Sequence, residues 1–224
     1  LAAEFTGEAQ QMLREYEELS RPIALWRAAS LRGRLAASRR AEAALDAMMT
    51  PGRTPPARTE TVIVGAGLAG ITVASHFAAD GVELALLEKS AHAGGVWRAH
   101  GNPFSRVNSS EPGYRLHLRH RPTPNTNHSH RHEILADCAR AFEQFSLAEV
   151  AYAGVEVTAA ARARGASGWL MGCVAGGRWM SVSCEWAILC TNRRLGIPRA
   201  LVVEGEEGFG GQIRRGLSGD ALDL

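Results

Sequence analysis

The sequence has little of several features that mark other classes of protein. Four cysteines occur in 224 residues and none forms a C-x-x-C pair, so neither a disulfide scaffold nor a zinc or redox motif is indicated. No apolar run approaches the ~20 residues that span a bilayer. The net charge of +2 is too small to indicate binding to nucleic acid or to an acidic membrane. With 46% apolar residues the chain is too apolar to be disordered, and its few cysteines favour a reduced, cytoplasmic setting.

The N-terminal quarter differs in pattern from the rest of the chain. Residues 4–49 carry apolar side chains at helical spacing, and the proline-rich stretch 50–60 is expected to end the helix as a linker. Helices rich in arginine and alanine are also typical of transit peptides, but the acidic cluster at 15–18 opposes that reading and favours a packing appendage. We therefore expect a helical appendage and linker over residues 1–58 and a domain over 59–224.

A β-α-β unit is predicted directly after the linker. Residues 61–64 form a short β-branched run that is typical of a buried parallel strand. A glycine-rich turn follows, then a helix over about 68–79 that Gly81 ends, and then a strand over 83–87. The order strand, helix, strand predicts an α/β fold with a parallel sheet.

The turn inside this unit has the sequence Gly65-Ala-Gly67-Leu-Ala-Gly70, a pattern typical of dinucleotide binding. Gly65 allows the tight turn, Gly67 lets a diphosphate approach the backbone, and Gly70 lets helix and strand pack closely. The helix N-terminus then offers N–H groups and the positive end of the helix dipole. Glu88 stands near the offset expected for a carboxylate on ribose, and a free acid there disfavours a 2′-phosphate. NAD or the ADP half of FAD fits this pattern and NADP does not.

The second half of the domain predicts one helix followed by strands. Residues 132–145 have an amphipathic pattern. Strand-like runs at about 152–160, 168–175 and 178–184 are separated by glycine-rich turns, and 186–190 is expected to be one more short buried strand.

Histidines cluster in a stretch without clear periodicity, residues 98–131. His128, His130 and His132 alternate along the chain, as metal ligands on a strand do. No carboxylate or cysteine completes a site and the stretch is rich in proline and asparagine, so we expect a solvated loop and no metal.

A longer string beyond the second strand carries a family resemblance. Glu88-Lys89-Ser-Ala-His-Ala-Gly94-Gly95-Val-Trp97-Arg98 resembles the E-K-x-x-x-x-G-G-x-W-R stretch of flavin-containing monooxygenases and related Baeyer–Villiger enzymes. The resemblance implies cofactor binding by Lys89, Gly94, Gly95 and Trp97, with the glycine pair and the tryptophan on the flavin side of FAD. Trp97 by itself is equally well explained as a core or rim aromatic residue.

Further segments resemble the same family. Asn108 with the two serines after it is similar to the N-S-S segment, which implies a catalytic asparagine; an Asx turn in a polar loop explains it equally well. Val157 lies in runs similar to the inserted β-meander, whose backbone contacts adenine, and Thr191 is similar to the element that closes the FAD site. Phe209 begins a stretch similar to F-x-G-x-x-x-H, with Arg215 in place of the histidine.

The resemblance implies a Rossmann-like FAD-binding domain with a parallel sheet and an inserted antiparallel β-meander, preceded by the helical appendage. It also implies an FAD-dependent monooxygenase that uses NADPH and O₂ to oxygenate a soft nitrogen or sulfur nucleophile, or a ketone, through a flavin hydroperoxide. The partners are then a small-molecule substrate and no nucleic acid.

The family's second glycine-rich motif, for NADPH, is absent from the sequence, so we expect a fragment with little NADPH oxidation of its own. Two alternatives remain. One is a non-catalytic FAD- or NAD-binding module, and the other is a different FAD oxidoreductase such as an amine oxidase. The G-G-x-W-R string argues against the second. The sequence does not indicate an oligomeric state.

Overall fold

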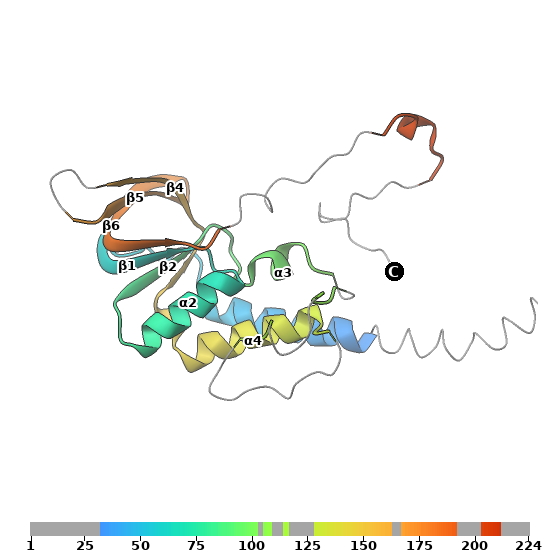
Figure 1. Ribbon diagram of the computed structural model, residues 1–224, viewed down its shortest axis with the longest axis horizontal. Coiled ribbons are helices and arrows are strands. Elements are labelled where there is room, and N and C mark those ends of the chain that lie inside the picture. Colours follow the sequence, from blue (N-terminus) through green and yellow to red (C-terminus); the bar gives the residue numbers. More distant parts are fainter. Residues whose placement is uncertain are drawn as a thin grey trace, which may run out of the picture.

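The structure is a computed structural model that describes residues 32–102, 105–108, 114–116, 128–162, 167–191 and 203–211. Its ordered elements form three layers, with an antiparallel sheet on one side, a parallel sheet in the middle and helices on the other side (Figure 1). Among the described residues, six strands form one continuous sheet in the order β3-β2-β1-β6-β5-β4.

The middle layer is the predicted β-α-β unit with one strand added. It consists of β1 (Arg58–Val64), β2 (Leu84–Glu88) and β3 (Ala151–Ala153), all parallel, with helix α2 (Leu68–Ala79) between β1 and β2. Helix α2 has the bounds that the sequence predicts. The short strand β3 was not predicted as a separate parallel strand.

The antiparallel layer contains β4 (Val155–Arg162), β5 (Trp169–Ala175) and β6 (Arg178–Leu189). The two strands expected at 178–184 and 186–190 are one, because β6 pairs with β5 along its first half and with β1, in parallel, along its second half. The expectation of a buried strand at 186–190 is wrong, since the Trp186 side chain, which lies opposite Thr61 of β1, is 64% exposed.

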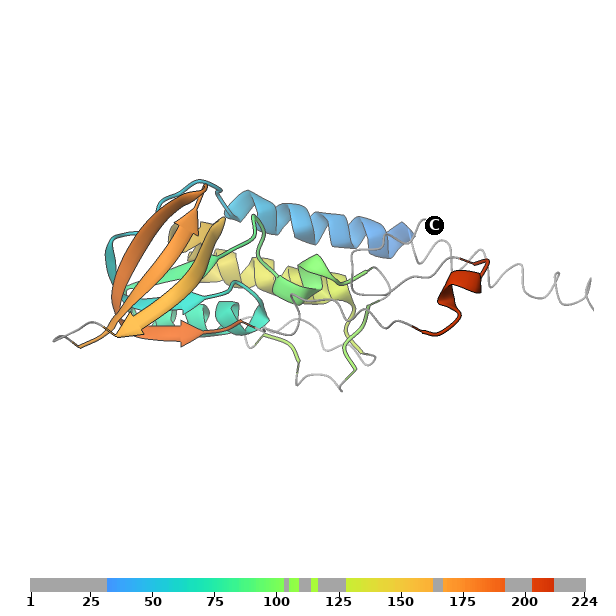
Figure 2. The ribbon, with the colours of Figure 1, turned by 90° about the horizontal axis from the view of Figure 1, so that it is seen from above.

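Among the described residues, three further helices and two 3-10 turns accompany α2. Residues 32–48 form a long helix that lies beside α4 (Arg131–Gln144) (Figure 2). Helix α3 is a short helix, Gly95–Ala99, and the 3-10 turns are η1 (Leu147–Glu149) and η2 (Glu206–Gly208). Within the described ranges, no helix is both long enough and apolar enough to cross a membrane.

Buried side chains of the described residues form two clusters, one on each face of the parallel sheet. Between the sheet and the helices, Ile63 and Leu86 pack with side chains of α2, α4 and the helix 32–48. Between the parallel and antiparallel layers lies a second apolar cluster of strand residues: Val62, Val64, Ala85, Leu87, Val155, Met171, Cys173, Val182 and Cys184. Alternation along β1 thus supplies both clusters, as expected for a strand buried on both faces.

The helix 32–48 is docked on this core. Ala41, Leu45 and Met49 are buried in the helical cluster. After the helix, Pro51 forms a bridge with Ala153 of β3, which ties the proline-rich linker to the sheet. The N-terminal part of the expected helix, residues 1–31, lies outside the described residues, and the division into an appendage (1–58) and a domain (59–224) stays a prediction.

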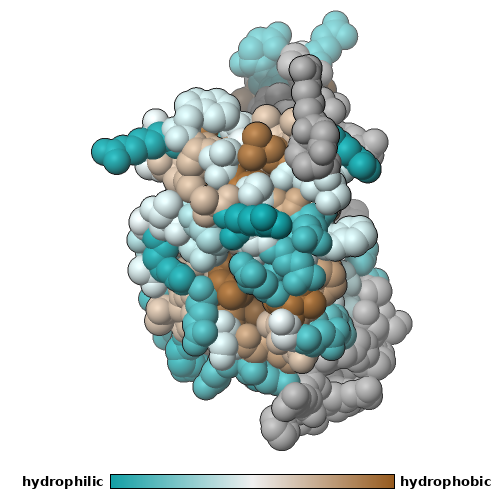
Figure 3. Space-filling view, turned by 90° about the vertical axis from the view of Figure 1, so that its left-hand side faces the viewer, coloured by the Kyte–Doolittle hydropathy of each residue, from teal (hydrophilic) through white to brown (hydrophobic). Residues whose placement is uncertain are grey.

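Exposed large apolar side chains occur at several separate positions. On the face that Figure 3 presents, hydrophobic residues show as patches between hydrophilic ones. The largest exposed fractions belong to side chains of the antiparallel layer and of the segment 203–211: Leu170, Trp179, Trp186, Leu189, Val203 and Phe209.

Candidate nucleotide-binding site

The glycine turn lies where β1 ends and α2 begins, and two of its glycines are required by backbone packing. Gly65 has φ +100°, and a β-carbon there would lie 3.0 Å from the carbonyl oxygen of Cys190. A β-carbon on Gly70 would lie 1.8 Å from the carbonyl oxygen of Gly65. A larger residue at Gly65 would therefore press on the chain that follows β6, and one at Gly70 would force the helix away from the turn.

Gly67 differs from its neighbours because its surroundings are open. Its φ of −78° suits any residue, and among the described residues a β-carbon on it would have only the Gly95 Cα within 4 Å, at 3.6 Å. Gly67 is the N-cap of α2, with no side-chain cap hydrogen bond and no acidic residue in the first turn of the helix. The helix N-terminus is therefore not filled by a capping side chain, which is what the approach of an anionic diphosphate requires.

Glu88 is fixed against this turn. The residue ends β2 and is buried, with 8% of its surface exposed. One carboxylate oxygen accepts a hydrogen bond from the N–H of Ala66 at 2.7 Å, and the other accepts one from the N–H of Ser90 at 2.9 Å. Each carboxylate oxygen has a further lone pair, so the group can still accept a hydroxyl hydrogen from a ribose. The sequence predicted the position of this acid but not its two backbone partners.

A second glycine segment packs on the first. Gly94 and Gly95 have φ of +107° and +53°, a region that disfavours other residues. The Gly94 N–H donates to the Ala66 carbonyl oxygen at 2.9 Å, and a β-carbon on Gly95 would lie 2.8 Å from the Gly67 Cα. The two glycine motifs, which lie about 30 residues apart in the sequence, thus come into backbone contact beside the N-terminus of α2.

Trp97 stands in α3 with an aromatic partner. Its indole N–H donates to the Tyr114 hydroxyl oxygen at 3.2 Å, and the two rings meet edge to face with centroids 5.8 Å apart. The ring also packs against the helical core, so Trp97 is half-buried. Tyr114 was not singled out from the sequence, because nothing in its local pattern links it to Trp97. Lys89 follows Glu88 on the surface and is exposed.

Of the other residues predicted to belong to the site, Thr191 borders the glycine turn, and Val157 and Asn108 lie in other segments. The Thr191 methyl carbon would lie 3.5 Å from a β-carbon on Gly65, so Thr191 borders the turn. Val157 is half-buried in the cluster between the sheets, next to a β-bulge in β4. Asn108 is exposed in a bend. The serines after it and Arg215 lie outside the described residues.

Two of the clustered histidines, His130 and His132, differ from the solvated loop that the sequence predicts, whereas His128 is exposed. His130 and His132 lie at the start of α4, are half-buried, and stack with ring centroids 5.5 Å apart. Burial is the main cause that lowers the pKa of both rings, and nearby arginines add to the effect. Within the described part of the chain, no group of three or more His, Cys, Asp or Glu side chains is arranged to hold a metal ion.

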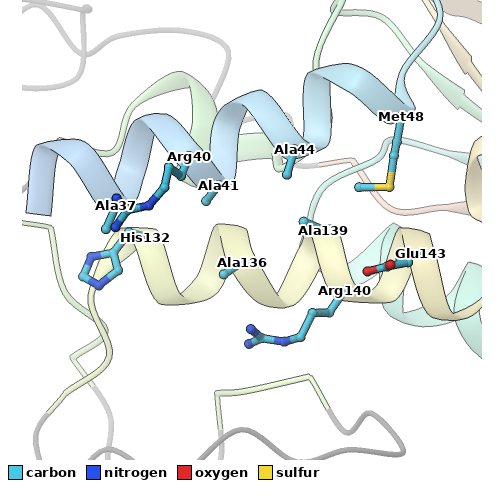
Figure 4. Close-up of a pocket in the computed structure, with 10 residues that line it drawn as sticks. All are labelled: Ala37, Arg40, Ala41, Ala44, Met48, His132, Ala136, Ala139, Arg140 and Glu143. Carbon is cyan, nitrogen blue, oxygen red and sulfur yellow. The ribbon is translucent and has the colours of Figure 1, made fainter.

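A groove of ≈ 420 Å³ lies between the helix 32–48 and α4, away from the glycine turn. Its sides are mostly alanine side chains from the two helices, with a histidine, two arginines and a glutamate at the edges (Figure 4): Ala37, Arg40, Ala41, Ala44, Met48, His132, Ala136, Ala139, Arg140 and Glu143. Its lining includes no glycine, so the glycine turn stays the candidate for a nucleotide site.

A family of nucleotide-binding domains and a monooxygenase match parts of this chain. Residues 63–138 match the NAD(P)-binding Rossmann-like domain family. A flavin-containing monooxygenase of Aspergillus flavus, ustF2, is 44% identical over 50 residues, which are 22% of this chain and 10% of that protein.

Solved structures show the same fold. A polycyclic ketone monooxygenase of Thermothelomyces thermophila has a TM-score of 0.56 and 19% identity, over 67% of this chain and 25% of its own. OTEMO, in complex with FAD and NADP, has a TM-score of 0.53 and 21% identity, over 71% of this chain and 30% of its own. The predicted Rossmann-like α/β fold and the resemblance to flavoprotein monooxygenases are therefore confirmed. The chain matches less than a third of the length of each of these relatives.

Proposed function

We propose that this chain binds FAD and that it forms the FAD-binding part of a monooxygenase. The observation that carries the proposal is the contact between two glycine motifs at the uncapped N-terminus of α2, with Glu88 fixed beside them. The proteins that this chain resembles include monooxygenases, and one of them is in complex with FAD and NADP.

Each part of the site has a role in this proposal. The N–H groups at the start of α2, reached past Gly67, bind the diphosphate. Glu88 accepts a hydrogen bond from a hydroxyl of the adenosine ribose. Val157 and Thr191 border the cofactor, and the exposed Lys89 lies beside the ribose. The open surroundings of Gly67 and the lack of a side-chain cap support the fit of a diphosphate at this position.

The flavin end is assigned to the second glycine segment. Gly94 and Gly95 let this segment pack closely, because a β-carbon on Gly94 would meet Leu135 and one on Gly95 would meet Gly67, and we propose that their backbone lies beside the isoalloxazine ring. Trp97, held by its hydrogen bond to Tyr114, forms an aromatic wall that excludes water from one side of the ring. Asn108 is proposed to orient the reacting groups.

Bound FAD would supply the redox chemistry, with NADPH as the reductant and O₂ as the oxidant. For the whole protein we propose oxygenation of a soft nitrogen or sulfur nucleophile, or of a ketone, on a small-molecule substrate. For this chain by itself we propose FAD binding with little NADPH oxidation, because the chain matches only a part of its monooxygenase relatives.

We also propose a cytoplasmic location. All four cysteines are free, and burial raises the pKa of the Cys138 thiol to about 12. Free cysteines are typical of a reducing compartment.

The test is the visible spectrum of the purified chain. Absorption bands near ~370 and ~450 nm are expected from bound flavin. Titration with FAD and with NAD, followed by flavin fluorescence and by calorimetry, then ranks the two ligands. A colourless protein that binds NAD and not FAD would refute the proposal in favour of the NAD-binding module.

A further inference from the structure

The segment that carries Gly94, Gly95 and Trp97 has little stability of its own. It contains two residues with positive φ and a helix of only five residues, α3. Helices of that length do not form in isolation, because the first turn costs more than its hydrogen bonds return. Some other part of the molecule must hold the segment against the glycine turn.

Two acids of the helix 32–48 hold one end of the segment. Arg98, the last residue of the G-G-x-W-R string, makes ion pairs with Glu42 at 3.0 Å and with Asp46 at 2.9 Å. Asp46 also contacts the His92 ring nitrogen at 2.8 Å. The Arg98 and Glu42 side chains are each 21% exposed, so water screens this pair less than the pairs of Asp46, which is 37% exposed.

A second arginine joins the same acid to the backbone of the segment. The other carboxylate oxygen of Glu42 pairs with Arg131 of α4 at 2.5 Å, and the Arg131 side chain is 6% exposed. Arg131 donates to the carbonyl oxygen of Trp97 at 2.7 Å and to that of Arg98 at 3.3 Å. Glu42 therefore orients both the side chain of Arg98 and, through Arg131, the main chain beside the tryptophan.

We propose that Glu42 and Asp46 are positioning residues for the flavin half of the cofactor site. The helix 32–48 is then part of the FAD-binding machinery, and its two acids act on FAD through Arg98 and Arg131. This inference rests on the proposed function. It predicts that loss of the two acids weakens the binding of FAD more than the binding of ADP. The reason is that the ADP half is held by the glycine turn and Glu88, which these acids do not contact.

The experiment compares the affinities for FAD and for ADP in the wild-type chain and in the double variant Glu42→Gln, Asp46→Asn. The amides keep the size of the side chains and remove their charge. We expect FAD to bind about tenfold more weakly, as loss of charge-assisted contacts implies, and ADP affinity to change less than about threefold. The matched control is Glu60→Gln, which removes an exposed carboxylate of β1 and should change neither affinity.

A milder variant guards against misfolding of the double variant. Asp46→Asn alone removes one partner of Arg98 and leaves the Glu42 contacts in place, so FAD affinity should fall by about threefold with no change for ADP. An equal loss of FAD and ADP affinity would show a general structural role and overturn the proposal, as would unchanged FAD affinity in both variants. A wild-type chain that binds ADP but not FAD would instead refute the proposed function.

Discussion

Gly67 and Gly70 offer the sharpest test of the site, because alanine at these two positions should have opposite effects. At Gly67 the backbone conformation accepts alanine, and the nearest atom to the new methyl group is the Gly95 Cα at 3.6 Å. Alanine lowers the entropy of the unfolded chain, which raises the free energy of unfolding by ~0.4–1 kcal/mol. Alanine is also a poorer N-cap than glycine, which lowers the free energy of unfolding by a similar amount. The apo protein should therefore keep its stability within ~1 kcal/mol.

Binding should respond differently at the same position. The methyl group of Gly67→Ala stands where the diphosphate approaches the N–H groups of α2. Loss of one charge-assisted hydrogen bond costs ~1.5–3 kcal/mol, which corresponds to an FAD affinity roughly 10- to 100-fold lower. Urea unfolding of the apo protein and a flavin fluorescence titration measure the two effects separately.

At Gly70 the new methyl group would lie 1.8 Å from the Gly65 carbonyl oxygen, a backbone atom that cannot move independently. Overpacking of this kind costs ~1–3 kcal/mol or more, so Gly70→Ala should lower the urea midpoint of the apo protein. Wild-type FAD affinity in Gly67→Ala would show that the diphosphate does not pass Gly67. Unchanged stability in Gly70→Ala would contradict the packing of α2 on β1.

Three further predictions follow from buried polar groups. Glu88→Ala should weaken FAD binding and also lower the stability of the apo protein by ~1–3 kcal/mol in urea unfolding, because two backbone N–H groups lose their acceptor; unchanged stability would argue against those contacts. Asp137→Ala should cost ~1.5–3 kcal/mol, since Asp137 is fully buried and Arg115 loses the two charge-assisted hydrogen bonds that it donates to this carboxylate; unchanged stability would contradict the ion pair. Burial lowers the pKa of His130 and His132, so the unfolded chain takes up protons first and stability should fall as the pH drops through about 6.5. Urea midpoints at pH 8 and pH 5.5 test this, and the drop should shrink when both histidines are replaced by asparagine.

The local parts of the fold could be predicted from the sequence. Helix α2 has the predicted bounds because glycine marks both of its ends, at Gly67 and Gly81, and apolar residues fill the span between them. The glycine turn and Glu88 were found for a similar reason. Their chemistry depends on a fixed spacing along one β-α-β unit, so a local pattern contains it.

The long-range parts could not be predicted. Strand β3 has only three residues and exists because β2 offers it a parallel neighbour. The continuity of β6 depends on two different neighbours, β5 and β1, which no pattern within the strand reveals. In the sequence, Glu42 and Asp46 look like exposed acidic residues of a helix. Only the folded chain brings them to Arg98.

The strand order has a consequence for motion. The sheet begins with β3 and ends with β4, yet these two strands are separated in the chain by Gly154 alone. At the opposite side, β6 passes from one layer into the other. The two layers are therefore connected on both sides. A hinge motion at one side cannot separate them and expose the apolar cluster between them. Val157, which we propose to border the cofactor, packs against the cluster between these layers, so its position should be the same with and without a ligand.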